Sequence, residues 1–71
     1  MMNKVDLEHL RAEYPKGCRL RLIKMDDVQA PPVGTLCTVQ YVDDAGTIHV
    51  NWDTGSSLGL IPDVDKFEVA E

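Results

Sequence analysis

The sequence predicts an all-β fold, a small five-stranded SH3-like barrel with a short N-terminal α-helix. Three observations lead to this prediction. Apolar residues first recur at helical spacing, they then alternate with polar residues in five short runs, and turn-forming residues separate these runs. The 71 residues are few enough for one domain, so we expect a single domain over 1–71.

The first segment, 4–14, is predicted to be the helix. The apolar residues of its one face are Val5, Leu7, Leu10 and Tyr14. Asp6 is the expected N-cap, which would let Val5 and Leu10 form a hydrophobic staple. The helix is expected to end before Pro15, because the residue before a proline avoids helical backbone angles.

The barrel is predicted over 17–69. Its strands are expected at 18–23, 35–42, 47–52, 57–61 and 66–69. Between them we expect a long loop at 25–34, hairpin turns at 43–46 and 53–55, and a 3₁₀ turn at 62–65. An OB-type barrel is the alternative, although it usually needs longer strands and a longer chain.

Strand alternation also predicts which side chains face the core. Tyr41, Trp52 and Phe67 are expected to point inward, with Trp52 as the main core anchor. Val42 breaks the alternation of its strand, which a bulge or the strand end would explain. With three of the four aromatic residues inside, a groove for proline-rich peptides is not expected.

The charge is unevenly distributed along the chain. The net charge of −5 argues against a general nucleic-acid binder, because phosphate contacts need a basic surface. Residues 1–24 contain six of the seven bases and three of the twelve acids, whereas 25–71 contain the other base and nine acids. If these two parts form separate surfaces, the molecule is strongly dipolar and could steer a partner or self-associate weakly.

Two cysteines, Cys18 and Cys37, are too few for a disulfide framework and lack the spacing of zinc or redox motifs. We expect both to be free thiols. No more than two apolar residues stand together, which predicts neither a membrane span nor a signal peptide. The expected location is the cytoplasm, with no membrane partner.

Several segments resemble a family of short bacterial, phage and mobile-element proteins that is catalogued only as a domain of unknown function. The matching segments are 17–23, 32–35, 38–39, 42–53 and 55–62, and the Asp-Asp-Ala-Gly to Trp-Asp-x-Gly block within them is the most specific. Cys37 and Asp63 stand where the family pattern tends to have glycine. The resemblance implies a bacterial or phage cytoplasmic origin, and it brings no catalytic residues.

The candidate binding surface is a basic stripe along and beside the first strand. It comprises Lys16, Arg19, Arg21 and Lys24, and His49 on the outward face of the third strand is added as a contact residue. Arg19 and Arg21 share a face, so both guanidinium groups could grip phosphate or a carboxylate. The alternatives are a charged edge strand or a cross-strand pair with Glu68.

No set of residues indicates catalysis or metal binding. The seven loop aspartates suit turns better than a Ca²⁺ or Mg²⁺ site, because they lack EF-hand spacing. Cys18 and Cys37 are expected to point inward and His49 outward, which disfavours a Cys–His pair.

These observations predict a non-enzymatic interaction module without a cofactor. We expect an accessory protein of a phage or mobile element that binds a protein partner, as a monomer or with weak self-association. The alternative is a nucleic-acid-associated module that uses the basic face locally.

Overall fold

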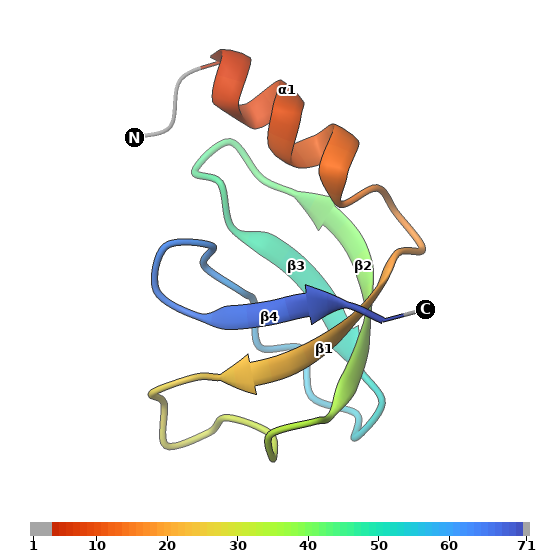
Figure 1. The fold of residues 1–71 in the computed structure, drawn as a ribbon, viewed down its shortest axis with the longest axis vertical. Coiled ribbons are helices and arrows are strands. Elements are labelled where there is room, and N and C mark those ends of the chain that lie inside the picture. Colours follow the sequence, from red (N-terminus) through yellow and green to blue (C-terminus); the bar gives the residue numbers. More distant parts are fainter. Residues whose placement is uncertain (1–3, 71) are drawn as a thin grey trace.

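The structure, a computed structural model, describes residues 4–70. These residues form one helix, α1 (Lys4–Glu13), and four strands, β1 (Arg19–Lys24), β2 (Leu36–Val42), β3 (Ile48–Trp52) and β4 (Lys66–Val69). The strands form one antiparallel sheet in the order β3-β2-β1-β4, and the sheet is not closed. The helix lies over one end of this curved sheet (Figure 1). The mainly β fold with a short N-terminal helix is therefore confirmed, whereas a closed five-stranded barrel is not.

The helix begins two residues before the predicted cap. Asp6 lies in the first turn, so its prediction as the N-cap is wrong. A carboxylate in the first turn still stabilises the helix through its interaction with the helix dipole. The predicted staple involves the side chain of Val5, which is not among those described. Leu7 and Leu10 are buried against the sheet, as the helical spacing predicts.

The predicted fourth strand, 57–61, is not a strand. Leu60 and Ile48 exchange two backbone hydrogen bonds, of 2.8 and 2.9 Å, in an isolated bridge. The neighbouring carbonyl of Leu58 accepts a 2.7 Å hydrogen bond from the indole of Trp52. Because a side chain takes this carbonyl, it is not available to extend a ladder. The segment follows the edge of β3 over a single residue pair.

A bulge in β2 reverses the orientation that was predicted for one side chain. The register with β3 shifts between Val39 and Tyr41, so Tyr41 lies opposite His49 on the outer face and is 57% exposed. Val42 is buried instead. The inward orientation predicted for Tyr41 is therefore wrong, and of the two explanations offered for Val42 the structure shows the bulge.

The core joins side chains from the sheet, from α1 and from the 57–61 segment. Its buried members are Leu7, Leu10, Leu20, Leu22, Cys37, Val39, Val42, Ile48, Val50, Trp52 and Leu60. Phe67 is only partly buried, and its ring meets that of Tyr14 edge-on at 5.4 Å between centroids. This contact ties the chain after α1 to β4.

Two of the predicted turns follow aspartate and glycine chemistry. Asp43 Oδ1 accepts hydrogen bonds from the backbone N–H groups of Ala45 and Thr47, both at 3.0 Å, and Gly46 has a φ of 87°. The predicted tight turn at 62–65 is present, but it is not a 3₁₀ helix. Its buried Asp65 accepts the N–H of Ile61 at 2.8 Å, which closes the turn before β4.

Both cysteines are free, and they differ in accessibility. Cys37 is fully buried and Cys18 is half-buried. Burial raises the pKa of the Cys37 thiol to about 11, so almost no reactive thiolate forms at neutral pH.

We expect a water-soluble disulfide reagent at about pH 8 to label Cys18 in the native protein and to leave Cys37 unmodified. Unfolding in denaturant should expose both thiols to the reagent. Mass spectrometry of the labelled protein checks this. Rapid native labelling of Cys37 would contradict its burial.

Candidate functional site

The two arginines of the predicted basic stripe are held in ion pairs. Arg19 forms a bidentate pair with Asp53, at 2.8 and 2.7 Å, and also donates to Thr38 Oγ1 at 2.8 Å. Arg21 pairs with Glu68 at 3.0 Å. The two guanidinium groups do share the outer face of β1, but each has a carboxylate beside it. The cross-strand pair with Glu68, one of the alternatives that the sequence offered for the stripe, is therefore found at Arg21.

The remaining arginine, Arg11, pairs with Asp44 at 3.1 Å. Each of these three ion pairs joins a base from 1–24 to an acid from 25–71. The two parts of the chain therefore do not form separate charged surfaces. In the fold, these bases and acids neutralise each other locally, although they are separated along the sequence.

The lysines of the stripe lie at opposite ends of β1. Lys24 is exposed and stands opposite another base, Lys66, in the register with β4. Lys16 is exposed in the turn between α1 and β1. Neither lysine has a carboxylate within ion-pair distance among residues 4–70. The predicted stripe is thus a row of paired arginines with one unpaired lysine near each end.

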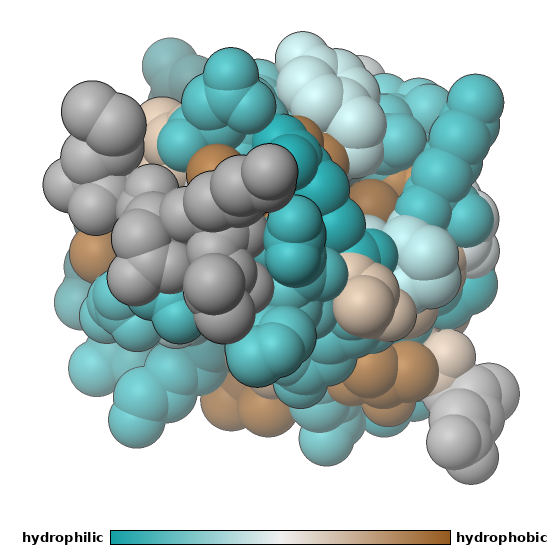
Figure 2. Space-filling model, turned by 90° about the horizontal axis from the view of Figure 1, so that it is seen from above, coloured by the Kyte–Doolittle hydropathy of each residue, from teal (hydrophilic) through white to brown (hydrophobic). Residues whose placement is uncertain are grey.

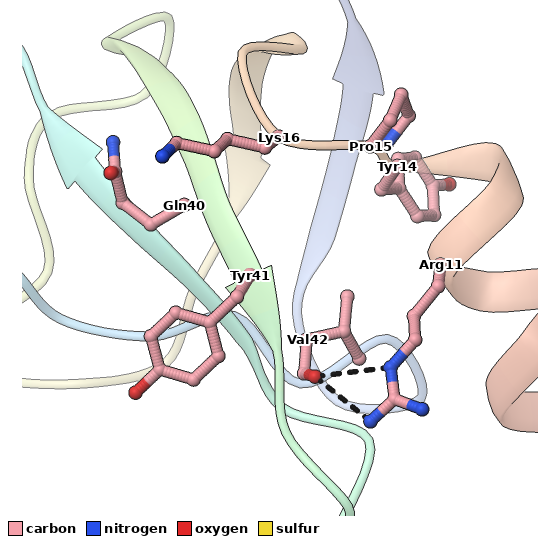
Figure 3. A pocket seen from close by; sticks show the side chains of 7 residues that line it. All are labelled: Arg11, Tyr14, Pro15, Lys16, Gln40, Tyr41 and Val42. Atoms are coloured by element: carbon pink, nitrogen blue, oxygen red, sulfur yellow. Dashed lines mark hydrogen bonds between the residues drawn. The ribbon is translucent and has the colours of Figure 1, made fainter.

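Lys16 belongs to an open hollow of about 210 Å³ between the end of α1 and β2 (Figure 3). This α1–β2 hollow is lined by Arg11, Tyr14, Pro15, Lys16, Gln40, Tyr41 and Val42. The described lining contains two bases, two tyrosines and no acid. Seen from above, the surface around α1 is mostly hydrophilic, with only small hydrophobic areas (Figure 2).

The guanidinium of Arg11 is fixed in the wall of the hollow. Its Nε and Nη2 donate to the carbonyl of Val42 at 3.3 and 3.1 Å (Figure 3). Nη2 also donates to Asp44 Oδ1 at 3.1 Å. Tyr14 stands beside it, and partial burial raises the pKa of its hydroxyl, with Glu13 adding to the effect. Tyr14 therefore stays protonated at neutral pH, with its hydroxyl next to the Glu13 carboxylate.

The exposed ring of Tyr41 is held by a stack of side chains. The ring of His49 lies against it at 4.4 Å between centroids and 9° between planes. His49 is bonded through Nε2 to Asp43 Oδ2 at 2.8 Å, and Asp43 is itself anchored by the turn that follows β2. His49 is therefore half-buried rather than fully exposed. Its position supports Tyr41, while the arginines lie apart from it along β1.

The turn carboxylate gives stability a defined pH dependence. Hydrogen bonding from His49, followed by that from the backbone of Thr47 and Ala45, lowers the pKa of Asp43 below its ordinary value of 3.8. A carboxyl group whose pKa is lower in the folded than in the unfolded state stabilises the fold at pH values above its unfolded-state pKa. This stabilisation is lost as the pH falls through its folded-state pKa.

We expect Asp43→Asn to lower the free energy of unfolding at neutral pH and to approach wild-type stability as the pH falls through the lowered folded-state pKa of Asp43. Denaturant unfolding of both proteins between about pH 7 and pH 2 measures the difference. Asp63→Asn, at an exposed turn position, is the control and should show little change. A constant gap between Asp43→Asn and wild type across this range would refute the role of the ionised carboxylate.

Sequence reasoning found one residue of the hollow and missed the others. Lys16 was predicted as a contact, whereas Arg11, Gln40 and Tyr41 were not. The signal for Tyr41 was the broken alternation at Val42, for which a bulge was one of two explanations. The bulge lies between Val39 and Tyr41 and reverses the side chains that follow it, so Tyr41 faces outward.

Comparison with known proteins shows the family to which the chain belongs. A family model described as a domain of unknown function, DUF4314, matches residues 3–70. The chain belongs to this family. Searches of curated proteins and of solved structures each found no match. The resemblance noted in the sequence is therefore confirmed for the family itself.

Two further features of this DUF4314 domain bear on its chemistry. Within residues 4–70, no three side chains of histidine, cysteine, aspartate or glutamate gather closely enough to hold a metal ion. The described helix is also too short and too polar to cross a membrane. Among the described surfaces, the α1–β2 hollow is the one that combines an unpaired cation with an exposed aromatic ring.

Proposed function

We propose that this DUF4314 domain is a small non-enzymatic interaction module that binds a protein partner through the α1–β2 hollow. The observation that carries the proposal is the exposed ring of Tyr41, held in place beside an unpaired lysine. We further propose an SH3-like architecture in which 57–61 takes the place of the fifth strand. The family resemblance supports an accessory role for a phage or mobile element in a bacterial cytoplasm.

The size of the hollow favours a protein ligand. About 210 Å³ lies below the roughly 300–1,000 Å³ of small-molecule pockets. The hollow is also open, so it would enclose little of a free metabolite. One large side chain projecting from a partner surface matches this volume better.

The rigidity of Tyr41 supports a role in recognition. Tyrosine is enriched at binding hot spots because it offers a large contact area with few rotatable bonds. Here the ring of Tyr41 stacks on His49, which is itself hydrogen-bonded to Asp43, so the ring is held before any partner arrives. Such preorganisation reduces the entropy lost on binding.

Nucleic acid is the weaker alternative. A phosphate track needs several free bases in a row, but Arg19 and Arg21 each face a carboxylate. Lys16 and Lys24 remain without such partners, at opposite ends of β1. The net charge of −5 opposes binding further.

The test is affinity capture from a nuclease-treated bacterial lysate with matched variants. Tyr41→Ala should lose the captured proteins, whereas Ile61→Ala, which truncates another exposed apolar side chain, should retain them. Arg19→Glu/Arg21→Glu should also retain them if the hollow is the binding surface. Circular dichroism would verify that each variant is folded. Capture that survives Tyr41→Ala but is lost with the double arginine variant would move the binding surface to β1.

A further inference from the structure

We infer that the α1–β2 hollow recognises an acidic peptide segment, with a large apolar side chain in the hollow and a neighbouring carboxylate on Lys16. This inference rests on the proposed function and specifies the chemistry of the partner. It follows from the charges, the walls and the hydrogen-bonding groups of the hollow.

The charges of the hollow favour an anion. The described lining contains Arg11 and Lys16 and no acid. Lys16 has no carboxylate within ion-pair distance in residues 4–70, so its ammonium group is available. Arg11 is already paired with Asp44 at 3.1 Å, and its Nη1 has no described acceptor. Lys16 therefore supplies the uncompensated positive charge that a carboxylate entering here would meet.

The walls favour an apolar side chain beside that carboxylate. Tyr14, Pro15, Tyr41 and Val42 contribute carbon surface to the lining. The ring of Tyr14 contacts Phe67 edge-on and the ring of Tyr41 stacks on His49, and the two rings extend to opposite sides of β2 (Figure 3). An aromatic or long aliphatic group could lie against this carbon surface and bury apolar area.

A polar group on the rim suits a peptide backbone. The Gln40 side chain lines the hollow and can donate or accept a hydrogen bond. Gln40 is uncharged, so it does not repel an acidic segment. An extended peptide could therefore bind with its backbone at the rim and one side chain inside.

The test uses two small probes that differ at one group, a charged carboxylate or a neutral amide. The full chain, labelled with ¹⁵N, is titrated with N-acetyl-L-phenylalanine and separately with its neutral amide, N-acetyl-L-phenylalaninamide. We expect the acid to shift the backbone signals of Tyr14, Lys16 and 40–42, and to bind up to about fivefold more tightly than the amide, as for an exposed ion pair.

Variants then show which residues cause the preference for the acid over the amide. Lys16→Gln should abolish the preference for the acid and leave binding of the amide, whereas Lys24→Gln, at the other unpaired lysine of the stripe, should change nothing. Tyr41→Ala should abolish binding of both probes.

Four results would overturn the inference: no shifts at the hollow with either probe, equal binding of acid and amide, a preference that survives Lys16→Gln, or a thymidine oligonucleotide that shifts the same signals more strongly than the acid. Equal probe binding together with capture that depends on Tyr41 would reject the acidic partner alone. Capture that is independent of Tyr41 would reject the proposed function of the hollow.

Discussion

Trp52→Ala should destabilise the protein by about 3–5 kcal/mol and leave it largely unfolded at room temperature. The side chain is only 3% exposed and is the sole tryptophan of a 71-residue chain, so its removal leaves a large cavity in a small core. The loss also frees the carbonyl of Leu58, which accepts the indole N–H at 2.7 Å. Thermal unfolding followed by circular dichroism measures the effect.

Trp52→Phe separates packing from hydrogen bonding. Phenylalanine keeps most of the apolar volume but cannot donate to Leu58, so we expect a smaller loss with a folded spectrum. The signals of 56–58 should move most in its NMR spectrum, because the indole bond holds that segment against β3. A cooperative, wild-type-like transition for Trp52→Ala would show that the indole does not anchor the core.

Leu60→Ala should cost about 2–5 kcal/mol, although this residue belongs to no named strand. Leu60 is 0% exposed and lies in the core, while its backbone exchanges two hydrogen bonds with Ile48. The cavity left by truncation lies under the edge of β3. Urea unfolding at neutral pH gives the free-energy difference from the shift of the midpoint at constant slope.

The neighbouring Ile61 provides the matched control. It is 48% exposed, so Ile61→Ala removes a similar aliphatic group with little cavity and should cost much less. Equal losses for the two variants would mean that the 57–61 segment contributes backbone pairing without a specific core contact.

Regular alternation made most of the sheet predictable. The runs that became β1, β3 and β4 keep one apolar face, and tight turns with aspartate and glycine stand between several of them. Leu20, Leu22, Ile48 and Val50 are buried as their periodicity predicts. Local chemistry is sufficient in these places because the hydrophobic pattern and the turn residues agree.

The candidate site was less predictable, because it depends on contacts between distant parts of the chain. Arg19 and Asp53 are 34 residues apart, and Arg21 and Glu68 are 47 apart, so their pairing follows from strand register. The pattern correctly placed both arginines on one face, but it could not show that Asp53 would lie beside Arg19.

The sequence by itself determined the helix, the four strands, most of the core and the family to which the chain belongs. The tertiary structure decided the open sheet, the single bridge at Leu60 and the outward turn of Tyr41. It also decided that the bases of 1–24 and the acids of 25–71 meet in ion pairs. The physical reason is that periodicity and turn chemistry act over a few neighbouring residues, whereas ion pairs, bulges and hollows depend on which strands come to lie side by side.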